Sequence, residues 1–277
     1  MLDPFQLPFM QRAAVEIALL APLAGLLGAQ IVLRRLAFYT HSVGAAAFPG
    51  LVIAGPAGIP AWLGALAAGG GYATLLQRLG RRSGAVATDA ATALLLVAAL
   101  AAGIVLASDV FASGAGVDRA LFGSLLGIGP EQLRFSAVAL ALTLLAALRF
   151  RPAWLAGGFD PASSRSLGLP PRADLALVAI VAIAVVASID AVGSLLVAAI
   201  LVVPAASVRP FAHSVPALEL GAATLALVEG IGGLLLAYEL DVPPGAAIAV
   251  LGGAVFALAL ALRALADRTT TTGGAAT

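Results

Sequence analysis

The chain has 277 residues, of which 61% are hydrophobic and 10% are charged, with a net charge of +1. Soluble domains carry about 45–50% apolar and about 25% charged residues, so this composition excludes a soluble fold and indicates an integral membrane protein. All 15 basic residues are arginine, and the lack of lysine excludes a P-loop, whose lysine contacts nucleotide phosphates. The lack of cysteine excludes disulfides and thiolate metal sites. The near-neutral charge gives no reason to expect nucleic-acid binding.

Hydrophobic segments of roughly membrane-spanning length recur along the chain. Their interiors are rich in Ala, Leu, Val and Gly without strict alternation, which predicts helices and not a β-barrel. We expect an all-α polytopic membrane helix bundle with about eight or nine transmembrane helices. It forms one transmembrane domain over residues 1–268, followed by a disordered tail over 269–277. The expected segments are Ala13–Leu33, Ser42–Ala54, Ile59–Leu79, Ala85–Ala107, Leu133–Leu148, Leu175–Ile189, Ala191–Val208, Ala217–Leu240 and Gly245–Leu265.

Two stretches depart from a simple span. The second segment is short and contains Pro49-Gly50, so we expect a broken or re-entrant helix there. The apolar piece Leu121–Ile128 is too short to cross a bilayer, so we expect it to cap the bundle.

Arginine placement predicts the orientation of the bundle. Arginines gather after alternate segments, whereas the connections Gly55–Pro60, Ser108–Arg119 and Glu239–Pro244 hold three aspartates and one glutamate against one arginine. The arginine-bearing ends are therefore expected in the cytoplasm. With nine crossings, the N-terminus would lie outside and the C-terminus inside.

Ionisable side chains within apolar segments usually face a cavity or a partner, because burying them in hydrocarbon is costly. Glu16, His41, Asp190 and Glu229 are of this kind, and Glu229 lies deepest. We take His41, Asp190 and Glu229 as candidates for a polar translocation pathway. Structural alternatives stay open: a protonated Glu229 bonded to backbone, His41 facing lipid headgroups, and Asp190 as a helix cap.

A membrane-embedded hydrolase is a weaker alternative that would use Ser194 and His213. A catalytic serine needs an activating base and an oxyanion hole. The two residues are 19 positions apart, which in a helix is about 28 Å, close to the thickness of the hydrocarbon core.

Two cytoplasmic stretches could dock a partner or simply connect helices. Phe159–Leu169 begins with Asp-Pro and ends near a glycine, which predicts a short exposed helix. Val202–Pro210 leaves the apolar run at a proline and turns polar.

Several passages together resemble the permease subunit of metal-type ATP-binding-cassette (ABC) importers for zinc, manganese or iron, over nearly the full length. Taken singly each passage is weak, but their order and spacing are specific. They are Arg35–Gly50, Phe122–Gly127, Asp160–Gly168 with Arg165 where alanine is usual, Val192–Ala206, and Leu240–Gly245.

This resemblance implies the vitamin, siderophore and metal importer-like permease fold in a bacterial inner (plasma) membrane. It implies a homodimer of permeases, two separate ATPase subunits and an extracytoplasmic metal-binding protein. This chain would then be a transport subunit and not an enzyme, with no cofactor of its own, because ATP is bound by the partner. Residues implied in ATPase coupling are Asp160, Arg165, Gly168, Pro204, Ser207, Arg209 and Pro210.

One departure from the resemblance concerns the cargo. Relatives place an aspartate in the second helix and a histidine four residues later, whereas this chain has His41 and Ala45 at those positions. A single imidazole suits zinc better than a hard cation, so zinc is the favoured cargo and manganese or iron the alternatives. An ABC permease for a non-metal small cargo and a secondary carrier that uses Glu229 also stay open.

Overall fold

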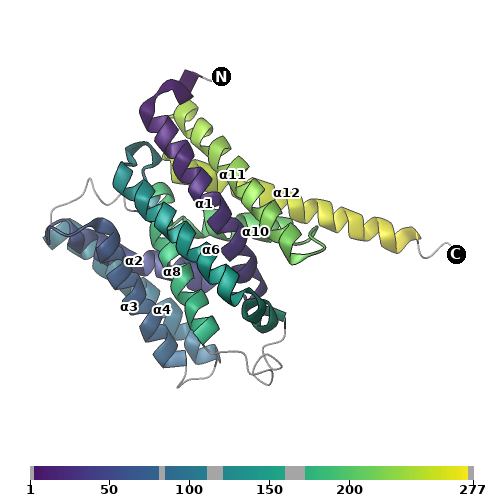
Figure 1. The fold of residues 1–277 in the computed structure, drawn as a ribbon, viewed down its shortest axis with the longest axis horizontal. Helices are drawn as coiled ribbons and strands as arrows, with labels where there is room; N and C mark the ends of the chain where they lie inside the picture. Colours follow the sequence, from purple (N-terminus) through teal and green to yellow (C-terminus); the bar gives the residue numbers. More distant parts are fainter. Residues whose placement is uncertain (1–2, 81–84, 111–120, 160–171, 274–277) are drawn as a thin grey trace.

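The structure is a computed structural model that describes residues 3–80, 85–110, 121–159 and 172–273. Within these residues all regular structure is helical, and Figure 1 shows the long helices packed side by side in a bundle. Seven helices in the described part are long and apolar enough to cross a membrane, and two shorter apolar helices cover Ala61–Leu76 and Val197–Val208. These nine stretches overlap the nine expected segments, which confirms the all-α polytopic membrane fold.

The helix bounds follow the apolar segments closely. In chain order, the described helices are η1 Asp3–Gln6, α1 Pro8–Leu33, α2 Ala37–Ala54, α3 Ala61–Gly80, α4 Ala85–Val105, the π-helical η2 Leu106–Val110, η3 Leu125–Gly127, α6 Pro130–Phe159, α8 Arg172–Val192, α9 Val197–Leu201, α10 Val203–Val208, α11 Val215–Leu240 and α12 Pro244–Gly273.

Helices α1 and α8 form the centre of the bundle. Of the 18 most apolar consecutive residues in each of these two helices, 67% are buried, compared with 17% in α4 and in α6. Helix α1 contacts α6, α8, α9, α10 and α11, and Met10, Ile17 and Leu20 on it are fully buried. The exposed apolar side chains of α4 and α6 therefore lie on the part of the surface that a bilayer would cover.

The second apolar segment is one continuous helix, so the expectation of a broken or re-entrant helix was wrong. Helix α2 runs from Ala37 to Ala54 with Pro49 inside it. Proline is tolerated within membrane helices when neighbouring helices compensate for the lost hydrogen bond. Here Gly50 lets α2 approach α3 so closely that a Cβ on it would overlap the Gly64 carbonyl oxygen. This close packing joins α2 to α3 along the turn that contains Pro49.

The break occurs instead in the seventh segment, Ala191–Val208, which we expected to be a single span. Helix α8 continues to Val192, so Asp190 lies in its last turn and not between two segments. Gly193 then has φ +85°, a conformation that glycine adopts readily, and a Cβ there would overlap the Leu121 carbonyl oxygen. The chain turns at this glycine and continues as the short helices α9 and α10.

The structure agrees with the expected cap at Leu121–Ile128 but differs from the expected C-terminal tail. Within Leu121–Ile128, Leu121 and Phe122 are helical and Leu125–Gly127 form the short 3-10 turn η3, which contacts α1 and α8. This agrees with a cap that does not span. At the other end, α12 continues to Gly273, so residues 269–273 of the tail that we expected to be disordered are helical. Figure 1 shows the second half of α12 projecting away from the bundle.

The close approach of α2 and α3 leads to a stability prediction. We expect Gly64→Ala to lower stability by about 1–3 kcal/mol, because the new methyl group would overlap the Gly50 backbone and overpacking costs about this much. Gly70→Ala on the same helix is the matched control, since a Cβ at Gly70 meets nothing within 4 Å. The measurement is the thermal unfolding midpoint in detergent. Equal midpoints for the two variants would contradict the packing.

Candidate functional site

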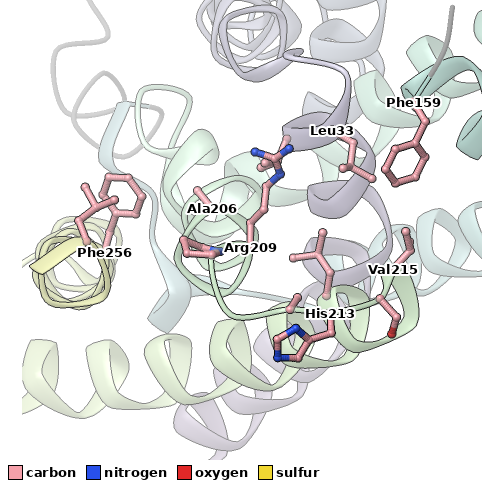
Figure 2. Close-up of a pocket in the computed structure, with 13 residues that line it drawn as sticks. Leu33, Phe159, Ala206, Arg209, His213, Val215 and Phe256 are labelled. Atoms are coloured by element: carbon pink, nitrogen blue, oxygen red, sulfur yellow. The ribbon is translucent and has the colours of Figure 1, made fainter. Parts of the chain in front are cut away.

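A cavity of about 680 Å³ lies at the end of the bundle that carries Arg34, Arg151 and Arg209, which we call the arginine end. The cavity walls come from the end of α1, the end of α6, the turn after α10, the start of α11 and the middle of α12. Figure 2 shows the Arg209 side chain extending across this cavity toward the end of α1 that carries Leu33. The lining residues are Val32, Leu33, Phe159, Ala206, Arg209, Pro210, Ala212, His213, Ser214, Val215, Leu218, Phe256 and Leu260.

The local sequence explains why a polar turn is presented here. Pro204 lies in the first turn of α10, where its missing N–H costs nothing. The hydroxyl of Ser207 donates to the Val203 carbonyl oxygen at 2.9 Å, so this buried polar group is satisfied within the helix. Helix α11 begins directly after Ser214, whose side-chain oxygen accepts from the Ala217 N–H at 3.3 Å. Residues 209–213 are therefore a short turn between two well-defined helix ends.

Arg34 braces the arginine end by joining three helices. It follows α1, and its guanidinium donates to the carbonyl oxygen of Trp154 on α6 at 2.8 Å and to a carboxylate oxygen of Asp174 on α8 at 2.7 Å. The Arg34 side chain is 12% exposed, whereas Asp174 is 69% exposed. The hydrogen bonds from Arg34 to the α6 backbone are thus shielded from solvent, whereas the ion pair with Asp174 lies at the surface.

A second ion pair fixes α6 to α11. Arg151 contacts Glu219 at 2.5 Å, and the glutamate side chain is 11% exposed. Together with Arg34, this contact holds the last turns of α6 against both α1 and α11. Phe159 at the end of α6 consequently forms part of the cavity wall.

The residues implied in ATPase coupling are only partly described. Pro204 and Ser207 are buried in α10, while Arg209 and Pro210 line the cavity. Asp160, Arg165 and Gly168, with the expected short helix around them, lie outside the described residues. Their chain segment starts directly after Phe159, at the cavity wall.

The three pathway candidates occupy different places in the bundle. His41 is half-buried in the second turn of α2, two residues after Tyr39, whose hydroxyl donates to the Val178 carbonyl oxygen on α8 at 3.2 Å. Asp190 lies twelve residues further along α8 than Val178, which corresponds to about 18 Å along the axis. Within the described residues, no group of three or more His, Cys, Asp or Glu is arranged to hold a metal ion.

Glu229 lies in the middle of α11 and is 2% exposed. Its Oε1 has no hydrogen-bond partner, and its Oε2 lies 3.2 Å from the position that a Cβ on Gly252 of α12 would occupy. Val203 of α10 also borders this position. The carboxyl group therefore points toward α12 and α10.

Asp190 lies in the last turn of α8. A polar contact that the sequence did not reveal lies between α1 and α6, where the hydroxyl of Ser136 donates to a carboxyl oxygen of Glu16 at 2.5 Å. Glu16 stood out in the sequence as a buried acid, but Ser136 did not, because a serine in an apolar helix is common. Only the packing of α6 on α1 brings them together.

The geometry gives no support to a serine hydrolase. Ser194 is fully buried, and its hydroxyl has no hydrogen-bond partner. It follows the Gly193 turn, which packs against Leu121 and Gly123, whereas His213 is exposed and lines the cavity at the arginine end. An activating base for Ser194 is therefore not found among the described residues.

Residues 6–263 match the sequence profile of the ABC 3 transport family. The chain belongs to this family. It is similar to the uncharacterised membrane protein in the ycf23-apcF intergenic region of Cyanophora paradoxa, at 30% identity over 96% of this chain and 90% of that protein. It is 29% identical to the manganese transport system membrane protein MntC of Halalkalibacterium halodurans, over 91% of this chain and 86% of that one. The chelated iron transport system membrane protein YfeD of Yersinia pestis is also 29% identical, over 93% and 86%.

Two solved structures share the fold. PsaBC from Streptococcus pneumoniae in complex with Fab superposes with a TM-score of 0.84 at 23% identity, covering 93% of each chain. An inward-facing conformation of a putative metal-chelate type ABC transporter gives a TM-score of 0.68 at 19% identity, covering 89% of this chain and 84% of that one. The family member described here is thus a multi-pass permease of the bacterial plasma membrane, and ATP hydrolysis falls to a separate chain.

The contacts of Arg34 at the arginine end predict that replacing Arg34 and replacing Asp174 lower the stability by different amounts. Arg34→Ala removes donors from a sheltered site and leaves the Trp154 carbonyl oxygen without its partner, so we expect a loss of about 1.5–3 kcal/mol. Asp174→Ala removes an exposed partner, and we expect a loss of about 0–1 kcal/mol. Thermal unfolding midpoints in detergent measure both. If Asp174→Ala proves the more harmful, the brace depends on the ion pair and not on the backbone contacts.

Proposed function

We propose that this chain forms the membrane pathway of an ABC importer that brings a divalent metal ion into the cytoplasm. It would work as a homodimer with two ATPase subunits and an extracytoplasmic metal-binding protein. The observation that supports this most directly is Glu229, a buried carboxyl group with one unpartnered oxygen in the middle of a membrane-spanning helix of an ABC 3 family chain. Intramembrane acids of this kind usually serve an ion pathway.

Manganese or iron is the cargo that the relatives favour. Proteins similar to this chain are named as manganese and chelated-iron transport system membrane proteins, and carboxylate oxygen suits manganese. The imidazole of His41 suits zinc or iron, so zinc stays a prediction that rests on this residue alone. Because His41, Asp190 and Glu229 lie in different surroundings, we propose that the ion contacts His41 and Glu229 in succession during passage.

The arginine end would face the cytoplasm, in line with the positive-inside rule. We propose that residues 209–213, together with the segment that follows Phe159, dock the ATPase subunit. This turn is held between the capped start of α11 and the end of α10, and α1 packs directly on α10. A movement of the turn would therefore be transmitted to α1 at the centre of the bundle.

The second half of α12 supports a dimer. Leu258, Leu262 and Leu265 there are 59%, 51% and 57% exposed, and the helix projects beyond its own bundle (Figure 1). A second copy of the chain would supply the neighbour that this helix lacks in one protomer.

The role of Glu229 is tested by the uptake of radioactive manganese into cells that depend on this transporter. We expect Glu229→Gln to lower the uptake rate by roughly tenfold or more, since a lost charge contact of about 1.4 kcal/mol corresponds to a factor of ten. Glu239→Gln is the matched control, because Glu239 is exposed near the end of the same helix and the same charge is removed. Competition by excess zinc and iron ranks the cargo. Wild-type uptake in Glu229→Gln would exclude the proposed pathway residue, and a wild-type strain that takes up none of these metals would favour a non-metal cargo.

The docking turn is tested with the chain reconstituted in liposomes together with its ATPase subunit. We expect Arg209→Ala to abolish ATP-driven uptake while the ATPase keeps its basal hydrolysis, because the partner carries the nucleotide site. Arg172→Ala is the control, since Arg172 is exposed and lies outside the cavity lining. ATP-driven uptake by Arg209→Ala at the wild-type rate would rule out this docking assignment. Uptake that survives without ATP but collapses with an uncoupler would favour a secondary carrier.

A further inference from the structure

Glu16 is the most deeply buried charged residue that the proposed metal pathway does not use. Its side chain is 0% exposed and lies two turns into α1. One carboxyl oxygen accepts a hydrogen bond from Ser136 at 2.5 Å, whereas Oε2 has no hydrogen-bond partner. An ionised carboxylate with a free oxygen is costly to bury within hydrocarbon. A ligand that neutralises this oxygen would remove the cost.

Two further carboxyl groups lie at the end of the bundle opposite the arginine end. Asp190 lies in the last turn of α8 and is partly exposed. Glu131 lies in the first turn of α6 and is exposed. The indole N–H of Trp62 holds Glu131 by donating to its Oε1 at 3.1 Å. The three acids thus form a series of rising exposure.

The other charged groups near α1 do not neutralise Glu16. Arg12, one turn earlier on α1, donates to the carbonyl oxygens of Pro8 and Ile128. Glu229 on α11 points toward α12 and α10, and Arg134 on α6 donates to the Pro130 carbonyl oxygen. Helices α9 and α10 and the turn η3 carry no ionisable side chain. Glu16 forms none of the ion pairs found in the described part of the chain.

We propose that Glu16 is a proton-binding site within the bundle. On release, the O–H bond of the Glu16 carboxylic acid breaks, the proton bonds to a water molecule, and Glu16 becomes the carboxylate. A proton fits better than a metal ion, because the described residues contain no three-ligand arrangement and a proton requires no cavity. Buried acidic side chains take part in proton transfer in other membrane transporters.

Proton binding does not depend on the proposed cargo, so it is tested first on the purified full-length chain in lipid nanodiscs. Infrared spectroscopy at neutral pH is expected to show a protonated-carboxyl band that Glu16→Gln loses. Glu239→Gln, the control, is expected to keep it. Ser136→Ala keeps the acid but removes its hydrogen bond, and the band is then expected to shift to higher frequency. A wild-type band that is unchanged in both Glu16→Gln and Ser136→Ala would overturn the proposal.

A second measurement distinguishes the proton from a metal ion. Manganese binding to the purified chain is compared for wild type and Glu16→Gln, and equal binding supports the proton assignment. If Glu16→Gln loses manganese binding, the site holds the metal and the proposal is overturned.

The use of this proton in transport rests on the proposed function. Metal uptake is measured against external pH, and Glu16→Gln is expected to lose the pH dependence of the wild type. A pH profile unchanged in Glu16→Gln would overturn the use of this proton in transport. Absence of metal uptake by the wild type would count against the proposed cargo while leaving the infrared result intact.

Discussion

Hydrocarbon offers no partner to a polar group, and this constraint governs the arrangement of the whole bundle. Charged side chains at the arginine end meet one another or backbone carbonyls, as Arg34 does with Trp154 and Asp174. Serine and threonine hydroxyls within the spans turn back onto their own helices, as Ser207 and Thr143 do. Among the described residues five buried side-chain atoms lack a hydrogen-bond partner, and two of them are carboxyl oxygens, on Glu16 and Glu229. These two acids stand out as functional candidates.

The central position of α1 explains how the two ends of the bundle are connected. It contacts η3 and η1 toward one end and α10 toward the other. Its Gly28 lies so close to α9 and α10 that a Cβ would overlap the Leu201 carbonyl oxygen at the end of α9 and lie 3.1 Å from the Cβ of Ala205 on α10. The turn at residues 209–213 therefore rests on a helix that also carries Glu16.

Composition and hydropathy predicted the fold well, because a membrane span needs only a run of apolar residues. The same reasoning placed the break in the wrong segment. Pro49 suggested it in α2, but a proline inside a membrane helix is accommodated when the neighbouring helix packs closely, as α3 does at Gly64. The true break depends on Gly193 having room only for hydrogen beside Leu121. That contact joins residues 72 positions apart, and no local pattern contains it.

The polar site was predictable residue by residue but not as an arrangement. An acidic residue within an apolar segment can be recognised from the sequence alone, and Glu16, Asp190 and Glu229 were all found in this way. Whether two of these acids lie in the same environment depends on which helix packs against each of them. Ile17 and Gly230 touch where α1 crosses α11, so Glu16 and Glu229 lie at similar depth, but Glu16 faces α6 and Glu229 faces α12. Two buried acids on different sides of one helix contact can bind different ligands, which allows a proton site and a metal pathway to coexist at the same level of the membrane.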